Sequence, residues 1–301
     1  MNGIGGINVA AITPRGKQGG ADFGATLELI GFLCDAGVNG IALLGSTGEF
    51  ATLSSEERSR LAFLAVKRSR VPVLVGVAHA TLDGAVGLGR EACSAGAAGL
   101  LLMPPYFFRY GQDDIREFYL QFAAQLGRGV PIYLYNIPFF TSELAVETAI
   151  ELLATGLFAG IKDSSGSIDY FERLLEHRNN RRFTLLIGND VIFTRARAAG
   201  ADGVVSGVAC AVPELLIGID RALQAGAAAQ AARLDARLHE FIGWIDRFPT
   251  PVLVRVAAEM RGLKTGPLAL PLPPEKAKLL HEFREWFGAW LPRVRRESAD
   301  A

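Results

Sequence analysis

One pattern repeats along most of the chain: a short apolar run, a polar break, and then a stretch with apolar residues at helical spacing. Apolar runs without alternation are typical of strands buried on both faces, as in a parallel sheet covered by helices. The first residues of successive runs lie 20 to 33 positions apart, which suits a strand followed by a covering helix. The eight runs are residues 7–13, 40–46, 71–78, 99–105, 131–138, 158–164, 183–190 and 203–209.

Eight strand–helix units are the number that closes a parallel barrel with no exposed sheet edge. We therefore predict an α/β fold, a (β/α)8 TIM barrel, over residues 1–224. Two helix starts support this arrangement. Ser54 and Glu57 have the spacing of a capping box, and Pro213 suits the first turn of a helix after the eighth run.

The pattern changes after the eighth unit. Residues 225–301 show helical spacing but no further strand run, and prolines interrupt the spacing at 248–251 and 271–274. We predict that this part is a small, all-helical C-terminal domain. Pro292 removes a helical hydrogen bond, so the sequence predicts a frayed tail from that residue onward.

Composition narrows the function classes. Of 301 residues, half are hydrophobic, and 31 Lys+Arg balance 31 Asp+Glu, so neither a nucleic-acid surface nor an electrostatic membrane anchor is expected. The chain has no signal-like N-terminus and no apolar run of about 20 residues. Three isolated cysteines, Cys34, Cys93 and Cys210, fit reduced thiols. We predict a cytoplasmic protein, and the four histidines lack metal-ligand spacing, so no metal and no cofactor are predicted.

The sixth run carries the first candidate for chemistry. In a strand, Gly160, Lys162 and Ser164 share one face, and Ile161 and Asp163 share the other. If the Lys162 face is the barrel lumen, the ammonium lies in an apolar mouth, where desolvation favours the neutral amine that attacks carbonyl carbons. The alternative is a strand-end lysine whose amine reaches solvent, which is the commoner fate of a lone lysine.

Two further runs favour the chemical interpretation. Tyr133 and Tyr135 share one face of the fifth run, and Tyr135 lies near its end, where a phenol can relay protons to a carbonyl adduct. Tyr133 suits a packing role inside the barrel. The second run ends in Ser46 and Thr47 between glycines, of which Gly48 follows directly. Hydroxyl and amide donors in such a turn can bind a carboxylate, although a glycine-flanked pair can also be a simple turn.

These segments resemble the dihydrodipicolinate synthase / N-acetylneuraminate lyase family. The resemblance rests on three signatures in order, Gly45-Ser46-Thr47-Gly48-Glu49, Tyr135-Asn136-Ile137-Pro138 and Gly160-Ile161-Lys162-Asp163, and covers the chain from Ile7 to about Pro213. It implies a class I aldolase without metal, usually a homotetramer built as a dimer of dimers. It also implies a small-molecule substrate, pyruvate or another 2-oxo acid.

The resemblance assigns roles to the same residues. Lys162 would form a Schiff base with the 2-oxo acid, and Tyr135 would relay protons. Ser46 would couple to Tyr135, and Ser46 and Thr47 would hold the carboxylate of the 2-oxo acid. The implied activity is that of a lyase, an aldolase or hydro-lyase, acting on pyruvate or on a 2-keto-3-deoxy sugar acid.

Two departures argue against the activity that names the family. Synthases that use aspartate semialdehyde carry an arginine shortly after the tyrosine motif, and here Phe140 occupies that position. An apolar ring cannot replace a bidentate carboxylate clamp. Those synthases also pass a second tyrosine across a subunit interface, and here Phe107 stands there. Condensation of pyruvate with aspartate semialdehyde remains the alternative, with Arg109 as the nearest substitute cation.

Further residues at strand ends are candidates for the rest of the substrate. Ser164, Gly188 and Asp190 could contact a sugar acid, yet Val191 follows Asp190 where sialic acid lyases carry an acid. Phe140, with the neighbouring Phe139, Phe107 and Phe108, predicts an apolar second pocket that suits a less polar aldehyde.

Two other function classes remain open. The segments at 188–190 and at Ser206, after the seventh and eighth runs, have the positions of a barrel phosphate site, as in phosphosugar isomerases. A catalytically silent regulatory or binding barrel is the other class. Retention of Lys162 and Tyr135 together argues against a silent barrel, because a lumenal lysine has no packing use.

Overall fold

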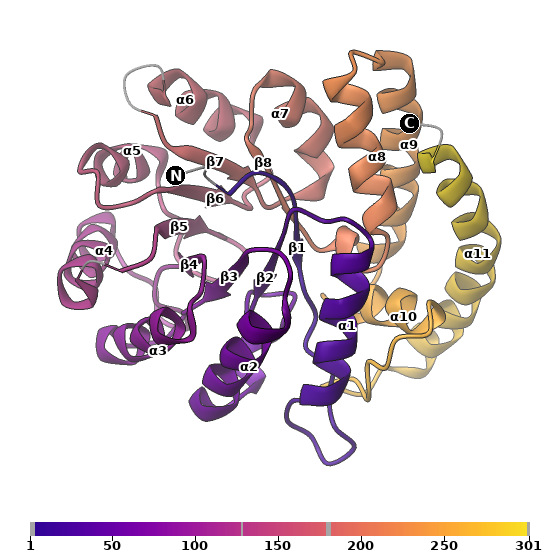
Figure 1. Ribbon diagram of the computed structural model, residues 1–301, viewed down its shortest axis with the longest axis horizontal. Helices are drawn as coiled ribbons and strands as arrows, with labels where there is room; N and C mark the ends of the chain where they lie inside the picture. Colours follow the sequence, from indigo (N-terminus) through magenta and orange to yellow (C-terminus); the bar gives the residue numbers. More distant parts are fainter. Residues whose placement is uncertain (1–3, 128, 179–181, 300–301) are drawn as a thin grey trace.

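Eight parallel strands form a closed barrel in the computed structural model, which describes residues 4–127, 129–178 and 182–299 (Figure 1). Each strand pairs with the next in sequence, and the eighth pairs with the first. All eight predicted strands are confirmed. They are β1 (Gly6–Ala10), β2 (Gly40–Leu43), β3 (Val73–Gly76), β4 (Gly99–Leu102), β5 (Ile132–Asn136), β6 (Gly160–Asp163), β7 (Thr184–Ile187) and β8 (Gly203–Ser206).

A helix follows each strand and covers the outside of the barrel, so nearly every strand residue is buried, as the unbroken apolar runs predict. The capping box of Ser54 and Glu57 is confirmed at the start of the second helix, and Pro213 is the first residue of the eighth. The helices are α1 (Phe23–Asp35), α2 (Ser55–Arg68), α3 (Leu82–Ala95), α4 (Gln112–Leu126), α5 (Val146–Ala154), α6 (Ile168–Arg178), α7 (Phe193–Ala199) and α8 (Pro213–Gln224).

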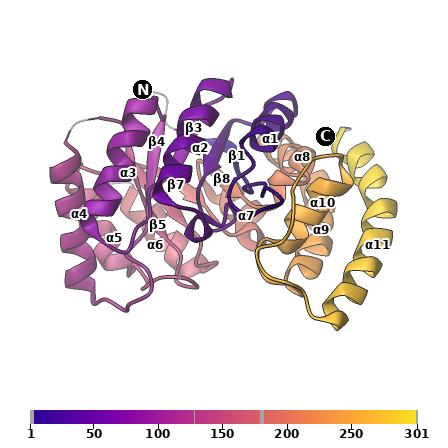
Figure 2. The same cartoon turned by 90° about the horizontal axis from the view of Figure 1, so that it is seen from below.

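Three more helices, α9 (Ala228–Ile245), α10 (Val252–Met260) and α11 (Pro274–Ala299), form the C-terminal part and lie beside α8 (Figure 2). Aromatic rings of α9 and α11 pack together, with the centroid of Phe241 5.6 Å from that of Phe287 and 5.6 Å from that of Trp290. The all-helical character is as predicted, whereas the division into two domains at residue 225 stays a prediction.

The predicted fraying from Pro292 is wrong. Helix α11 runs through Pro292 to Ala299, and Val294 and Ser298 are buried. Ser298 packs against α8 at Gly218, where an added Cβ would lie 3.2 Å from the Cβ of Ser298. Tertiary contacts of the last turns therefore outweigh the hydrogen bond that proline cannot donate.

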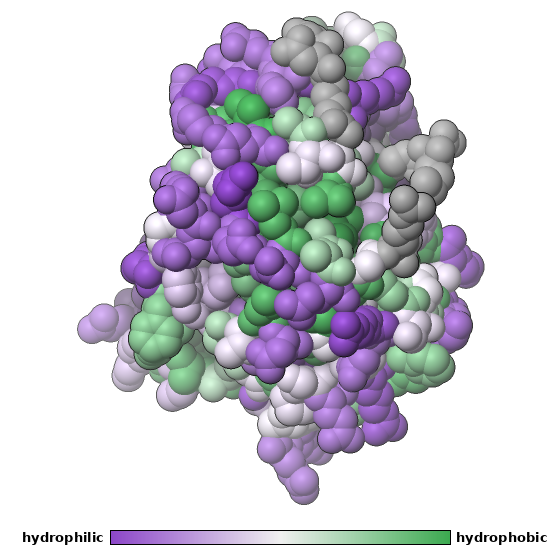
Figure 3. Space-filling view, turned by 90° about the vertical axis from the view of Figure 1, so that its left-hand side faces the viewer, coloured by the Kyte–Doolittle hydropathy of each residue, from purple (hydrophilic) through white to green (hydrophobic). Residues whose placement is uncertain are grey.

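On the face that lies to the left in Figure 1, hydrophobic residues gather near the middle and hydrophilic ones surround them (Figure 3). Within the described residues, no helix has the length and apolar character needed to cross a membrane.

Candidate active site

A cavity of about 510 Å³ lies where the C-terminal ends of the strands meet helices α9 and α10. In a (β/α)8 barrel this end of the strands is where side chains converge from separate loops. Eight of the ten predicted site residues line this one cavity, and Gly48 and Ser206 do not. The eight are Ser46, Thr47, Tyr135, Phe140, Lys162, Ser164, Gly188 and Asp190.

Lys162 and Tyr135 are neighbours inside the barrel. Strands β5 and β6 pair so that Tyr135 lies opposite Lys162, and the two side chains are 1% and 3% exposed, respectively. The Nζ atom of Lys162 lies 3.8 Å from the centroid of the Tyr135 ring. The amine is therefore inside the cavity and beside a phenol, as the strand periodicity predicts, and not at the solvent edge of the strand.

The turn after β2 brings Ser46 to the same point. Its Oγ lies 3.4 Å from the Tyr135 hydroxyl, and either oxygen can be the donor. Leu44 and Glu49 on the two sides of this turn have left-handed backbones, with φ of +59° and +50°. Such conformations cost energy in residues other than glycine, so surrounding contacts must hold the turn in place.

Gly48 supports this turn from behind and does not face the cavity. Its carbonyl accepts a hydrogen bond of 2.8 Å from the Thr13 hydroxyl. A Cβ at this position would lie 3.1 Å from the Leu44 amide nitrogen and 3.2 Å from the Ala11 carbonyl oxygen. The glycine is thus needed because two backbones approach it closely, while Thr47 lines the cavity.

Gly188 makes room for the lysine. An added Cβ would lie 2.7 Å from the Cε of Lys162 and 2.0 Å from the Oγ of Ser164, both far below contact distance. Ser164 Oγ is shielded from solvent and has no hydrogen-bond partner among the described residues. The Lys162 side chain and the Ser164 hydroxyl therefore occupy space that any residue other than glycine at position 188, directly after β7, would fill.

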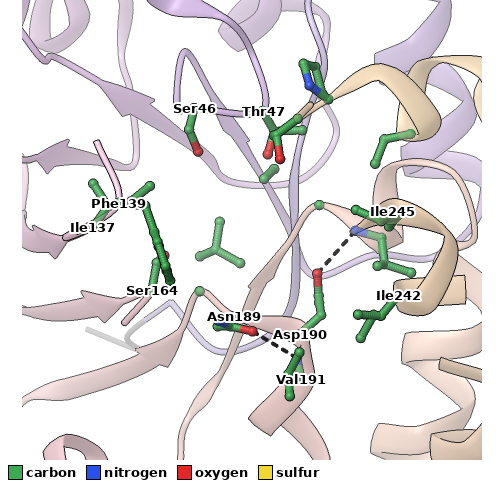
Figure 4. Close-up of a pocket in the computed structure, with 18 of the residues that line it drawn as sticks. Ser46, Thr47, Ile137, Phe139, Ser164, Asn189, Asp190, Val191, Ile242 and Ile245 are labelled. Carbon is green, nitrogen blue, oxygen red and sulfur yellow. Dashed lines mark hydrogen bonds between the residues drawn. The ribbon is translucent and has the colours of Figure 1, made fainter. Parts of the chain in front are cut away.

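Asp190 lies across the cavity, after β7 (Figure 4). Burial raises the pKa of its carboxyl above the usual range, while hydrogen bonds from the Ser206 hydroxyl and the Val208 amide, together with the charge of Lys162, act in the opposite direction. Ser206 is fully buried behind the cavity wall and donates to Asp190. Ser206 can therefore reach a substrate only through Asp190 and not by direct contact. The hypothesis of a phosphate site at 188–190 and Ser206 thus lacks the contact expected from Ser206.

A second pair links the same two strands on the outside of the barrel. Asn136 and Asp163 lie opposite each other, and the Asn136 Nδ2 donates to an Asp163 carboxylate oxygen at 2.8 Å. Asp163 also accepts from the backbone and the hydroxyl of Ser165, and burial raises its pKa. Asp163 points to the helical layer, as predicted, so the inward residues Tyr135 and Lys162 are held in register from behind.

Arg255 is a residue at this site that the sequence analysis missed. It extends from α10 with 1% exposure and donates to the Thr13 carbonyl at 2.8 Å and to the Glu49 carboxylate at 2.9 Å. It also donates to the Thr265 carbonyl. The C-terminal helices thereby hold the turn that carries Ser46 and Thr47. The one signal in the sequence is a lone arginine within the apolar run at 252–258.

The four phenylalanines expected around a second pocket do not all lie there. Phe139 and Phe140 line the cavity, but Phe107 and Phe108 do not. They form a T-shaped pair on the surface with 85% and 63% exposure. The expectation for Phe107 and Phe108 is wrong, because the backbone at Phe107 turns with φ of +85° and directs the pair outward.

Arg109 does not supply the missing cation in this geometry. Its guanidinium donates to the backbone carbonyl of Thr141, and it does not line the cavity. Among the cavity-lining residues that the structure describes, Lys162 is the one basic side chain. No cluster of three or more potential metal-ligating His, Cys, Asp or Glu side chains occurs in the described ranges.

Comparisons with known proteins agree with this architecture. A model of the dihydrodipicolinate synthetase family matches residues 3–288. A 4-hydroxy-tetrahydrodipicolinate synthase of Methanothrix thermoacetophila is 33% identical over 270 residues, covering 89% of this chain and 91% of the relative. The structure of such a synthase from Methylacidiphilum fumariolicum superposes with a TM-score of 0.89 at 29% identity, over 98% of this chain and 99% of that one. A dihydrodipicolinate synthase of Acinetobacter baumannii, solved with pyruvate, gives 0.87 at 27% identity, over 97% and 99%.

Proposed function

The chain belongs to the dihydrodipicolinate synthetase family, and on that premise we propose that Lys162 forms an imine with a 2-oxo acid such as pyruvate. The chain is an enzyme, a lyase of the class I aldolase type. The observation that carries the proposal is the position of the Lys162 amine, buried in the cavity and 3.8 Å from the ring centroid of Tyr135. Borohydride tests it, because it reduces an imine to a stable secondary amine.

The proposed reaction begins when the neutral Lys162 amine attacks the C2 carbonyl carbon of the 2-oxo acid. The carbonyl oxygen takes a proton from the Tyr135 hydroxyl, and the phenolate takes one N–H proton from the attacking nitrogen and passes it to the same oxygen. This oxygen then leaves as water, which gives the protonated imine and leaves Tyr135 as the phenolate. The protonated imine then withdraws electrons from C3. The Tyr135 phenolate takes a proton from C3, which gives an enamine. Attack of the enamine on an aldehyde forms a carbon–carbon bond and regenerates the protonated imine, while the aldehyde oxygen takes a proton to become a hydroxyl; cleavage is the reverse.

Ser46 and Thr47 are proposed to position the 2-oxo acid. The Ser46 Oγ is 3.4 Å from the Tyr135 hydroxyl, so it can accept a hydrogen bond from the phenol or donate one to the phenolate. Thr47 offers a second hydroxyl on the same side of the cavity. Hydrogen bonds from these donors to the carboxylate would orient C2 toward Lys162, which is the geometric requirement for attack.

Aspartate semialdehyde should be a poor partner for pyruvate in this enzyme. Its carboxylate would face Phe140 in the cavity, where none of the described lining residues offers a guanidinium to pair with it. A lost hydrogen bond to a charged group costs about 1.5–3 kcal/mol, roughly ten- to a hundredfold in kcat/KM. The condensation is measured with both substrates, and Phe140→Arg is expected to raise its rate. A kcat/KM for this condensation within tenfold of ordinary enzyme efficiency would contradict the expectation. If Arg109→Ala then abolished the condensation, Arg109 would be identified as the substitute cation.

Assembly is proposed to be a homotetramer, a dimer of dimers, in the cytoplasm. The family resemblance suggests it, and the exposed pair of Phe107 and Phe108 supports it, because a large apolar pair on a surface is typical of a contact site. Light scattering at micromolar concentration should give four chains, and Phe107→Ser/Phe108→Ser should give smaller species. Leu157→Ser, at another exposed apolar residue, is the control. A wild-type monomer would contradict the proposal.

A further inference from the structure

We propose that the partner of the 2-oxo acid is an uncharged, apolar aldehyde, aliphatic or aromatic, whose hydrocarbon part lies against helices α9 and α10. This inference rests on the proposed function, since such an aldehyde reacts with the enamine formed on Lys162. It concerns the part of the same cavity that lies away from Ser46 and Thr47, which we call the far half. Side chains of the C-terminal helices help to line this part.

The far half of the cavity is apolar. Ile242 and Ile245 of α9 and Val254 of α10 line it, together with Phe139 and Val191 from the barrel loops. In Figure 4, Ile242 and Ile245 lie on the right of the cavity and Phe139 on the left, with Ser46 and Thr47 above. Ser46 and Thr47 therefore lie on the proposed carboxylate side, and the remaining wall is mostly hydrocarbon, with Asn189, Asp246 and Thr250 as its other polar residues.

The charges of the lining residues disfavour an anionic partner. The acidic and basic side chains among the described lining residues are Lys162, Asp190 and Asp246. Lys162 is taken up by the imine, whose positive charge pairs with the carboxylate of the 2-oxo acid. A second carboxylate would thus find no free cation among the described lining residues.

Two shielded polar atoms of the lining suit a single oxygen of the partner. Ser164 Oγ and Asp190 Oδ1 are both shielded and without a hydrogen-bond partner among the described residues. Burial raises the pKa of Asp190, which favours a carboxyl that can donate its proton. Together they fit the aldehyde oxygen as it becomes a hydroxyl in the new bond. Further hydroxyls that lie against Val191 and the isoleucines would find no hydrogen-bond partner on those side chains.

The experiment measures kcat/KM for condensation of pyruvate with a series of acceptors. The series runs from acetaldehyde through butanal to hexanal and includes benzaldehyde; glyoxylate and glyceraldehyde serve as charged and hydroxylated acceptors. Burying one methylene is worth about three- to fourfold in kcat/KM, so rates should rise by about that factor per carbon. Glyoxylate and glyceraldehyde should react more slowly than aliphatic aldehydes of similar length.

Two variants test the wall itself. Val191→Thr keeps the side-chain volume but adds a hydroxyl, and Ile245→Asn adds an amide on α9. Each should lower the ratio of hexanal to glyceraldehyde turnover by at least threefold. The matched control is Leu157→Asn, at an exposed leucine outside the cavity, which should leave that ratio as in the wild type. Val191→Thr is the conservative variant if Ile245→Asn does not fold.

The outcomes separate this inference from the proposed function. If wild-type enzyme is not trapped by borohydride with pyruvate, both fail. If it is trapped but kcat/KM does not rise with aldehyde length, or glyoxylate or glyceraldehyde reacts faster than butanal, the apolar partner is wrong while the imine stands. Equal ratios in Val191→Thr, Ile245→Asn and wild type would also overturn the assignment of this wall.

Discussion

Borohydride reduction of the enzyme in the presence of pyruvate should add one adduct to each chain, on the peptide that contains Lys162. Lys162 is 3% exposed and lines the cavity, so a bound carbonyl meets its amine away from bulk water. Its neighbours Tyr135 and Ser164 provide a proton donor and a free hydroxyl at the point of attack. Intact-mass measurement followed by peptide mapping gives the stoichiometry and the site.

Lys162→Ala should remove the adduct completely, because no other described lysine lines the cavity. Lys264 provides the matched control: it is exposed and paired with Glu28 at 3.0 Å, so Lys264→Ala should label as the wild type does. Labelling of a different lysine in the wild type, or equal labelling in Lys162→Ala, would refute the imine mechanism.

Much of the fold could be predicted because its signals are local. Unbroken apolar runs at regular intervals specify strands buried on both faces, and eight units specify closure. The strands proved shorter than the runs at their C-terminal ends, since residues such as Ser46 and Ser164 leave the sheet to form the cavity. The frayed tail was predicted wrongly at Pro292, because the packing of Val294 and Ser298 depends on residues far away in sequence.

The site was predicted in part for the same reason. Period-two alternation places Lys162 and Tyr135 inward, and the pairing of β5 with β6 brings them together. The roles of α9 and α10 could not be predicted, because nothing local indicates that Ile245 reaches the mouth or that Arg255 binds Glu49. The outward direction of Phe107 likewise follows from a positive φ that its residue type does not favour.

The C-terminal helices also explain how a strained turn persists in the cavity wall. Glu49 adopts a left-handed backbone, and its carboxylate is fixed by Arg255 at 2.9 Å. Burial lowers the pKa of Arg255, while the charge of Glu49 acts in the opposite direction, so the ion pair offsets part of the cost of burying the guanidinium. The appendage therefore stabilises the turn of Ser46 and Thr47 as well as covering the mouth.

Tyr135→Phe should lower the rate at which the enzyme exchanges the C3 protons of pyruvate for deuterium by about 10²- to 10⁴-fold. Exchange reports imine and enamine formation, so it needs no aldehyde and is followed by NMR in deuterated water. The substitution keeps the ring that packs 3.8 Å from the Lys162 amine and removes the hydroxyl that lies 3.4 Å from Ser46. The loss should therefore come from proton transfer and not from packing.

Tyr133→Phe is the matched control for this prediction. Tyr133 lies two residues earlier on β5 and is buried, but it does not line the cavity, and burial raises the pKa of its hydroxyl. Tyr133→Phe removes a hydroxyl from the same strand but away from the reacting atoms. The exchange rate per folded enzyme should therefore stay within about threefold of the wild type, which is far smaller than the fall expected when a general acid is lost. Near-normal exchange in Tyr135→Phe would leave Tyr135 as a packing residue, and a large fall in Tyr133→Phe would show that the strand, and not the Tyr135 hydroxyl, limits the rate.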